Sequence, residues 1–198
     1  MQQAILEARE QRWQAKLALA RAYRACVLSL CLNIPGPDKN PPGAEQACAL
    51  LQAALRKAHA REAQRLLASP AWTSPKQRKA QRAVLHTKSR RGSCAAFARE
   101  ICGKGADGPY RLMVSPLPGR TLKRMAVSLE SAHPLGRLAD IDILTETGKS
   151  VSRTDLGLPP RSCFLCGEPA ALCRRSKKHA QGELAAFIGA LLRRALSL

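Results

Sequence analysis

Two aspartates, Asp140 and Asp142, stand two residues apart in the segment 138–145. In a β-strand such residues share one face, about 6.6 Å apart along the backbone. Ile141 and Ile143 would then point to the opposite face and into a core. Paired carboxylates bind hard divalent cations, which bridge phosphate oxygens and neutralise the charge of a leaving diphosphate. The spacing predicts a metal site on a rigid strand, and the alternative is an edge strand with two acids on its solvent face.

The two residues before this strand favour the metal site. Gly136 would let a polyphosphate approach the backbone, and Arg137 would bind one of its oxygens. A glycine followed by D-x-D on a strand is typical of nucleotidyltransferases that resemble the DNA polymerase β superfamily. The chain has only 14 acidic residues, and placing two of them on one face has an electrostatic cost unless a cation offsets it.

A second set of residues that could bind a metal lies near the C-terminal end. Its spacing is Cys163-x2-Cys166-x6-Cys173-x5-His179. The first pair has the spacing of a zinc knuckle, and three cysteines with a histidine suit tetrahedral zinc. The alternative is three buried thiols and a surface histidine. Nearby Lys and Arg side chains would stabilise thiolates even without a metal.

The net charge indicates the kind of partner. The sequence has 33 Lys and Arg against 14 Asp and Glu, a formal charge of +19. Such an excess attracts polyanions, whether nucleic acid, a polyphosphate ligand, an acidic protein or an anionic membrane. No apolar run approaches the roughly 20 residues of a spanning helix, and charges such as Glu7 and Arg12 interrupt any signal-peptide core. We therefore expect a cytoplasmic protein without a membrane segment, whose eight cysteines stay reduced.

The periodicity of apolar residues predicts helices and strands in mixed order. Helices are expected over 1–25, 44–68 and 183–196, and strands over 26–34, 110–115, 122–130 and 138–145. The very basic segment 76–91 is expected to continue as helix toward Cys102. The fold class is α+β, with a helical N-terminal half packed on a small, mostly antiparallel sheet. We expect a single domain over 1–198 that includes a Cys/His segment at 161–179.

The loop after the first strand carries a further candidate, Lys39, among prolines and Gly36. A lysine on a rigid loop could bind phosphate, and the alternative is an ordinary surface turn. The chemistry of the loop alone leaves both open.

Taken together, these segments resemble the apo-citrate lyase phosphoribosyl-dephospho-CoA transferase family, also called holo-citrate-lyase synthases. The resemblance covers most of the chain and is weakest over about 70–109. The matching pieces are 33–37 with Lys39, 130–138 running into Asp140 and Asp142, 152–161, and Cys163, Cys166, Cys173, Arg175 and His179.

The resemblance implies a specific reaction. The donor would be 2'-(5''-triphosphoribosyl)-3'-dephospho-CoA and the acceptor a serine of the acyl carrier subunit of citrate lyase. The serine oxygen would attack the α-phosphorus, and diphosphate would leave. Magnesium is the expected cation at Asp140 and Asp142. Both substrates are polyanions, as expected for a partner of a chain with this charge.

The resemblance also indicates further site residues. A polymerase-like site needs a third carboxylate, and Glu130 is the candidate because alternation along 122–130 would place it on a strand face with Arg124 and Ser128. Arg153 and Arg161 are expected to bind the donor together with Lys39, Gly136 and Arg137. The base that deprotonates the serine stays open among Asp142, Glu130 and His133.

Two alternatives remain at this stage. A zinc-knuckle nucleic-acid-binding protein would explain the charge and the cysteines. It would leave the paired aspartates unexplained, because they repel a phosphate backbone, and an aromatic fraction of 4% offers few stacking platforms. The analogous malonate decarboxylase carrier-protein transferase shares the donor, but the Cys/His segment and the 33–39 loop favour the citrate lyase family.

Overall fold

The computed structural model describes residues 2–68 and 97–197. Its centre is a five-stranded sheet with the order β2-β3-β1-β4-β5, in which every neighbouring pair is antiparallel. The strands are β1 (Cys26–Leu32), β2 (Arg99–Gly105), β3 (Gly108–Ser115), β4 (Ala139–Leu144) and β5 (Ser150–Val151). The predicted α+β class with an antiparallel sheet is therefore confirmed.

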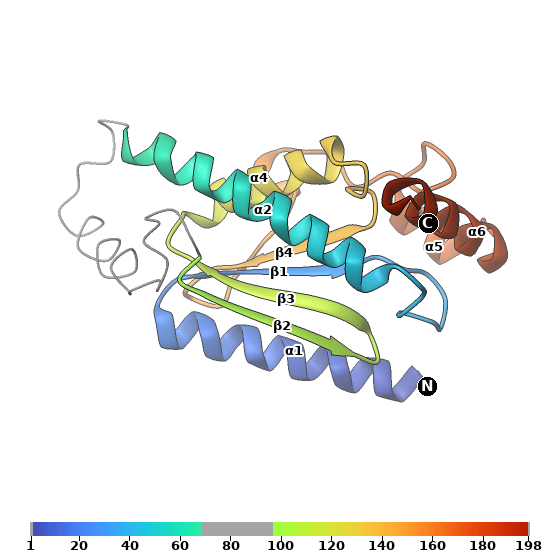
Figure 1. Cartoon of the computed structure of the whole chain (residues 1–198), viewed down its shortest axis with the longest axis horizontal. Coiled ribbons are helices and arrows are strands. Elements are labelled where there is room, and N and C mark those ends of the chain that lie inside the picture. Colours follow the sequence, from blue (N-terminus) through green and yellow to red (C-terminus); the bar gives the residue numbers. More distant parts are fainter. Residues whose placement is uncertain (1, 69–96, 198) are drawn as a thin grey trace.

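Helices cover both faces of this sheet (Figure 1). One face packs against α1 (Gln2–Tyr23), and the other packs against α2 (Ala44–Leu67) and α4 (Gly119–Ala132). A short 3-10 helix, η1 (Thr154–Leu156), follows β5, and α5 (Ala170–Ser176) and α6 (Gln181–Leu196) lie at the end of the sheet where β1 ends. In the described part of the chain, no helix is both long and apolar enough to cross a membrane.

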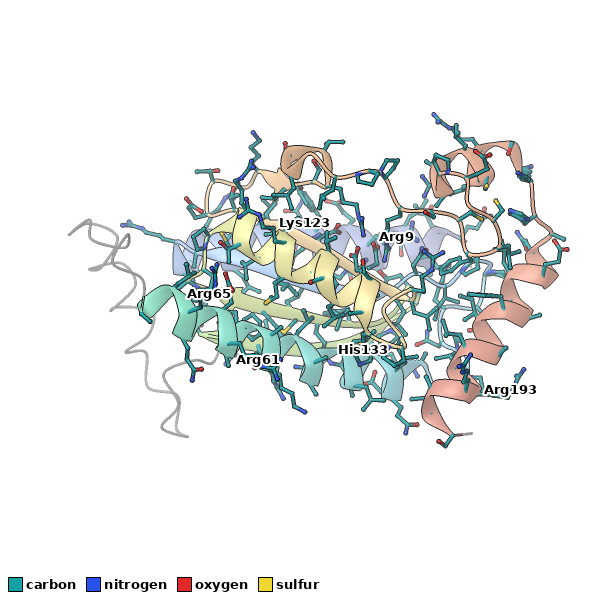
Figure 2. All side chains as sticks on the ribbon, turned by 90° about the horizontal axis from the view of Figure 1, so that it is seen from above. Arg9, Arg61, Arg65, Lys123, His133 and Arg193 are labelled. Atoms are coloured by element: carbon teal, nitrogen blue, oxygen red, sulfur yellow. The ribbon has the colours of Figure 1, made fainter. Side chains whose placement is uncertain are left out.

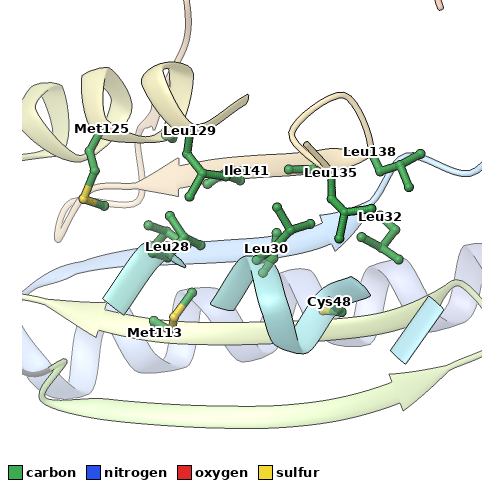
Figure 3. Packing of buried hydrophobic residues seen from close by; sticks show 14 of the residues in the cluster. Leu28, Leu30, Leu32, Cys48, Met113, Met125, Leu129, Leu135, Leu138 and Ile141 are labelled. Atoms are coloured by element: carbon green, nitrogen blue, oxygen red, sulfur yellow. The ribbon is translucent and has the colours of Figure 1, made fainter. Parts of the chain in front are cut away.

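The larger hydrophobic core lies between the sheet and α2, α4 and α6. Alternate residues of β1 and β4, such as Leu28, Leu30 and Ile141, point into it and are fully buried (Figure 3). Fully burying such a side chain stabilises the fold by roughly 1.5–3 kcal/mol. The opposite face of β1 packs Val27 against Ala20 of α1 in a second, smaller cluster. Because β1 is buried on both faces, it fixes the position of β4 beside it.

Two secondary-structure predictions were wrong. Residues 122–130 form most of α4, not a strand, because Leu122, Met125, Ala126 and Leu129 recur with helical spacing and form the buried face of that helix. Residues 99–105 form the edge strand β2 instead of continuing a helix toward Cys102. The basic segment 76–91 itself, like Cys94, lies outside the described residues.

The remaining predictions of elements agree with the structure. Helices over 1–25, 44–68 and 183–196 correspond to α1, α2 and α6, and strands over 26–34, 110–115 and 138–145 correspond to β1, β3 and β4. The loop from α4 to β4 turns back tightly on α4. A Cβ at Gly136 would lie 2.5 Å from the carbonyl oxygens of Leu129 and Glu130.

Gly136→Ala is therefore expected to destabilise the fold by about 1–3 kcal/mol, since the backbone must move to admit the methyl group. Denaturant unfolding would measure the change. Gly182→Ala is the matched control, because nothing lies within 4 Å of its Cβ position and it lies in the first turn of α6, where alanine is favourable. Equal stability of the two variants would contradict a packing role for Gly136.

Candidate active site

Asp140 and Asp142 lie on one face of β4, as predicted. The burial of the strand alternates, with both carboxylates exposed and Ile141 and Ile143 in the core. Their side chains are 53% and 64% exposed, and across the ladder they stand opposite Cys31 and Ser29 of β1. The two carboxylates therefore form an open acidic site on the face of the sheet that α1 covers.

Lys16 of α1 lies beside this site, and sequence reasoning missed it. Its Nζ is 3.7 Å from Asp142 Oδ2 although its side chain is only 8% exposed, and the ammonium group also lies 4.8 Å from the ring centre of Trp13. Arg9, Arg12 and Lys16 follow one another at helical spacing on the same stripe of α1. Arg12 is occupied by an ion pair with the buried Asp107. The spacing of these three cations was the signal that could have revealed them.

The outer edge of β4 is completed by side chains. β5 pairs only with Ile143 and Leu144, so it does not reach the first half of the strand. There, the Ala139 carbonyl accepts a hydrogen bond from Arg161, and the Ile141 carbonyl accepts one of 2.9 Å from Lys123 Nζ. These two cations therefore flank the backbone that carries Asp140.

Arg161 links two of the predicted carboxylates. Its guanidinium lies 3.5 Å from Asp140 Oδ1 and 3.6 Å from Glu130 Oε2. Arg153 also reaches Glu130, at 2.5 Å. The structure thus brings Asp140, Glu130, Arg153 and Arg161 together, although Glu130 arrives from a helix and its side chain is almost fully buried. Glu130 was predicted as a site residue because a strand would have placed it on one face with Arg124 and Ser128, but these residues lie in the helix α4.

Gly136 and Arg137, which were predicted to contact the donor phosphates, make contacts within the protein instead. Gly136 is required by its close approach to the end of α4. Arg137 donates hydrogen bonds to the carbonyls of Cys163, at 2.6 Å, and Ser162, at 3.4 Å, and its guanidinium lies 5.4 Å from the ring centre of Phe164. In this structure Arg137 therefore holds the Cys/His segment against the loop that precedes β4.

Lys39 lies at the same end of the sheet as Asp140. The loop that carries it begins where Asn33 N–H donates to Leu138 O at 2.7 Å, and Lys39 Nζ donates to the Ile34 carbonyl. Partial burial lowers the pKa of Lys39, and the nearby Arg9 lowers it further. A cation with a lowered pKa and a cationic neighbour is a good phosphate ligand, because an anion would relieve both effects.

The charge of Asp140 is disfavoured by its surroundings. The protein around this half-exposed carboxyl removes part of its hydration, which raises its pKa first; the adjacent Asp142 carboxylate raises the pKa further, while Arg161 opposes both effects. A bound divalent cation would stabilise both carboxylates. The two residues therefore have the oxygen ligands that a hard cation prefers, and a mutual repulsion that such a cation would relieve.

The four predicted ligands of the Cys/His segment converge. One ligand atom from each of Cys163, Cys166, Cys173 and His179 lies within 4.8 Å of the others. Cys166 Sγ is 3.5 Å from Cys173 Sγ and 3.3 Å from His179 Nε2. With Zn–S bonds of about 2.3 Å, a tetrahedral site separates two sulfurs by about 3.8 Å. The cluster could therefore hold a metal ion with little rearrangement.

The backbone around the first cysteine supports that role. A tight hairpin forms where Cys163 N–H donates to Glu168 O at 2.7 Å. Burial raises the pKa of the Cys163 thiol, but the N–H groups of Leu165 and Cys166 and the neighbouring thiols outweigh it and lower the pKa to about 6. Backbone N–H groups that stabilise a thiolate prepare a soft metal ligand.

Comparison with known proteins identifies the family. The sequence profile of the apo-citrate lyase phosphoribosyl-dephospho-CoA transferases matches residues 1–76 and 77–195. The chain belongs to this family. The resemblance seen in its motifs is thereby confirmed.

Curated relatives carry the same description. A protein named apo-citrate lyase phosphoribosyl-dephospho-CoA transferase from Escherichia coli O139:H28 (strain E24377A / ETEC) is 48% identical over 87 residues, which are 44% of this chain and 48% of the relative. One from Shigella boydii serotype 18 (strain CDC 3083-94 / BS512) is 47% identical over 87 residues, with the same shares. The chain thus spans about half the length of the curated relatives it matches.

The raised pKa of Asp140 predicts how stability depends on pH. An acid with a raised pKa costs stability once it ionises, so the cost develops as pH rises from its usual pKa of 3.8 through the raised value. Asp140→Asn removes this cost, and we expect it to unfold with a free energy up to about 1 kcal/mol higher than the wild type at pH 7, since the side chain is half exposed. The difference should vanish near pH 3.

Asp155→Asn is the matched control with the opposite sign. Hydrogen bonds from the Ser152 N–H and hydroxyl lower the pKa of Asp155, so this carboxylate contributes stability above its usual pKa and loses it as pH falls through the lowered value. Its replacement should destabilise the protein at pH 7. Denaturant titrations of both variants between pH 3 and 8 test the two signs, and a destabilised Asp140→Asn at pH 7 would contradict the raised pKa of Asp140.

Proposed function

We propose that this protein transfers the 2'-(5''-phosphoribosyl)-3'-dephospho-CoA group from its triphosphoribosyl precursor to a serine of the acyl carrier subunit of citrate lyase, and releases diphosphate. Membership in the family supports this reaction. The observation that carries it is the convergence of Asp140, Glu130 and Arg161 beside the open carboxylate of Asp142. We further propose a single, cytoplasmic transferase domain with a nucleotidyltransferase-like site.

The paired aspartates are the proposed ligands of magnesium. Both are exposed, they share a face, and the pKa of Asp140 is raised in part by its neighbour. The carboxylates of Asp140 and Asp142 would hold the ion, which would supply positive charge for the donor phosphates and the leaving diphosphate. Glu130 is the proposed third carboxylate of the site. It holds Arg153 and Arg161 in place rather than facing solvent, so its role is to position these two cations.

The donor phosphates are proposed to bind among the cations around the aspartates. Lys39 and Arg161, which the sequence predicted as donor ligands, remain proposed phosphate ligands. Arg9 and Lys16 are added, because α1 places them on the face of the sheet that carries Asp140 and Asp142. Arg153 is proposed to support phosphate binding indirectly, through its ion pair with Glu130. Arg137 and Gly136, which were also predicted to bind the donor, support the site indirectly through the Cys/His segment and the α4–β4 loop.

Existing contacts help to choose among the three candidates for the group that accepts the serine proton. Glu130 Oε2 is already occupied by two guanidinium groups, those of Arg153 at 2.5 Å and Arg161 at 3.6 Å, and its side chain is almost fully buried. Burial lowers the pKa of His133, and its Nδ1 accepts a hydrogen bond of 3.0 Å from Leu135 N–H. Asp142 is the candidate with the most accessible carboxylate. We propose that the serine oxygen bonds to the α-phosphorus as the bond to the β-phosphate breaks, with the proton passing to Asp142.

The other functions considered lack comparable support. A nucleic-acid-binding protein would place phosphates against Asp140 and Asp142, and no contact of the described residues favours that arrangement. The malonate decarboxylase analogue is not favoured by the family match either.

The transfer itself can be measured directly. The protein, apo carrier subunit, triphosphoribosyl donor and magnesium would be mixed, and the intact mass of the carrier followed. We expect the mass of the prosthetic group to appear, and Asp140→Asn and Asp142→Asn each to lower the rate by about a hundredfold or more, since charge stabilisation in the transition state is lost. Asp38→Asn is the control, as an exposed acid on the 33–40 loop. An unmodified carrier would refute the function, and two active variants would refute the metal site.

Zinc is the proposed occupant of the Cys/His cluster, with a structural role and four protein ligands. Protein purified without chelator should contain about one zinc per chain, and Cys166→Ser should lose the zinc and melt at a lower temperature, because binding a structural metal supplies folding free energy. Elemental analysis and thermal unfolding measure both. Cys102→Ser, which alters an exposed thiol outside the cluster, should keep the metal. A metal-free and fully folded wild type would exclude zinc and leave the transferase proposal intact.

A further inference from the structure

We propose that the exposed side of α5, together with the preceding hairpin at 162–169, is the surface on which the acidic carrier subunit docks. This inference rests on the proposed function, because it names where the second substrate of that reaction binds. It goes beyond the catalytic residues, which lie on β4 and the elements around it.

The charge of this surface is uncompensated. Arg174, Arg175, Lys177 and Lys178 are all exposed, and within the described residues none of them has an ion-pair partner. The neighbouring cluster explains only part of this charge. Three thiolates and a neutral histidine around Zn²⁺ carry a single net negative charge, which cannot balance four cations. An acidic partner would.

Two exposed leucines accompany the cations. Leu165 is 38% and Leu172 is 48% exposed, although large apolar residues are mostly buried elsewhere in the described chain. They directly precede Cys166 and Cys173, whose sulfur atoms lie 3.5 Å apart. Apolar side chains bordered by charges of one sign are typical of a protein–protein interface, where the apolar contacts lie inside a polar rim.

The surface is also connected to the proposed active site, both by packing contacts and along the chain. Phe164 in the hairpin packs on Phe187 of α6, at 5.7 Å between ring centres, and under Arg137. Ile188 and Leu192 anchor α6 in the main core. Arg161, which contacts Asp140 and Glu130, directly precedes the hairpin. A partner held on α5 would therefore lie next to the segment that carries Arg161.

An acidic protein fits this surface better than a nucleic acid does. Proteins that bind single strands rely on aromatic side chains on which bases stack, whereas the exposed apolar residues here are leucines. Surface charges of opposite sign mainly accelerate association and set orientation. Both effects suit a carrier that must present one serine to the site and then leave.

The test reverses two of the four charges at positions that are not metal ligands. In Arg174→Glu/Lys177→Glu, we expect the affinity for apo carrier, measured without donor, to fall by about tenfold or more. The KM for the carrier should rise to a similar extent, while kcat, the KM for donor and the metal content stay unchanged. Leu172→Ala, which removes an exposed side chain, should weaken carrier binding without lowering thermal stability.

The control is Lys57→Glu/Arg61→Glu, which makes the same charge change on exposed positions of α2. Figure 2 shows Arg61 on α2, well separated from α6, beside which α5 lies. The control should bind the carrier like the wild type. Unchanged carrier affinity in Arg174→Glu/Lys177→Glu, or an equal loss in both double variants, would overturn the docking surface. The docking surface would also be overturned if Arg174→Glu/Lys177→Glu lowered the affinity for a single-stranded oligonucleotide but left the affinity for the carrier unchanged. A wild type that leaves the carrier unmodified would instead refute the proposed function.

Discussion

The outer edge of β4 is the constraint on which the site depends. A strand must have partners for its carbonyl oxygens, and β5 is only two residues long and pairs with the second half of β4. Arg161 and Lys123 supply the missing donors at Ala139 and Ile141. Because a buried carbonyl without a donor costs about 1–3 kcal/mol, the sheet edge needs a donor on each side of Asp140, and in this chain both donors are cations. The site thus obtains its positive charge from the need to complete a sheet edge.

This edge also explains why distant segments meet. Arg161 continues directly into the Cys/His hairpin, and Arg137 at the start of β4 holds that hairpin by two backbone carbonyls. Glu130 binds Arg153 and Arg161 from the buried end of α4. The loop that joins α4 to β4 can be so short only because Gly136 has no side chain. The proposed catalytic site and the proposed metal cluster therefore share the same few contacts, and a metal bound in the cluster would stabilise the position of Arg161 as well.

Much of this could be predicted from the sequence, for identifiable reasons. A strand with alternating burial places Asp140 and Asp142 on one face whatever surrounds it, and knuckle spacing brings Cys163 and Cys166 together locally. Glu130 was assigned to the site by resemblance, but its strand was wrong, since the helical spacing of Leu122, Met125 and Leu129 was overlooked. Lys16 depends on the packing of α1 across the sheet. Such a long-range contact leaves no pattern in the sequence beyond the shared stripe of cations.

The distribution of charge follows from the two substrates that the site is proposed to bring together. On the α1 face, cations lie within reach of carboxylates, as in Lys16 with Asp142 and Arg161 with Asp140, so the local charge is nearly balanced until a metal and phosphates arrive. On α5 the cations have no such counter-charges among the described residues. A site whose charges are nearly balanced selects its ligand by geometry, because a phosphate must replace the carboxylates that already pair with the cations. A surface that is unbalanced acts at longer range and is screened by salt within about 10 Å at 0.1 M. If both proposals hold, the balanced α1 face binds the small donor by geometry, and the unbalanced α5 surface accelerates and orients the encounter with the carrier.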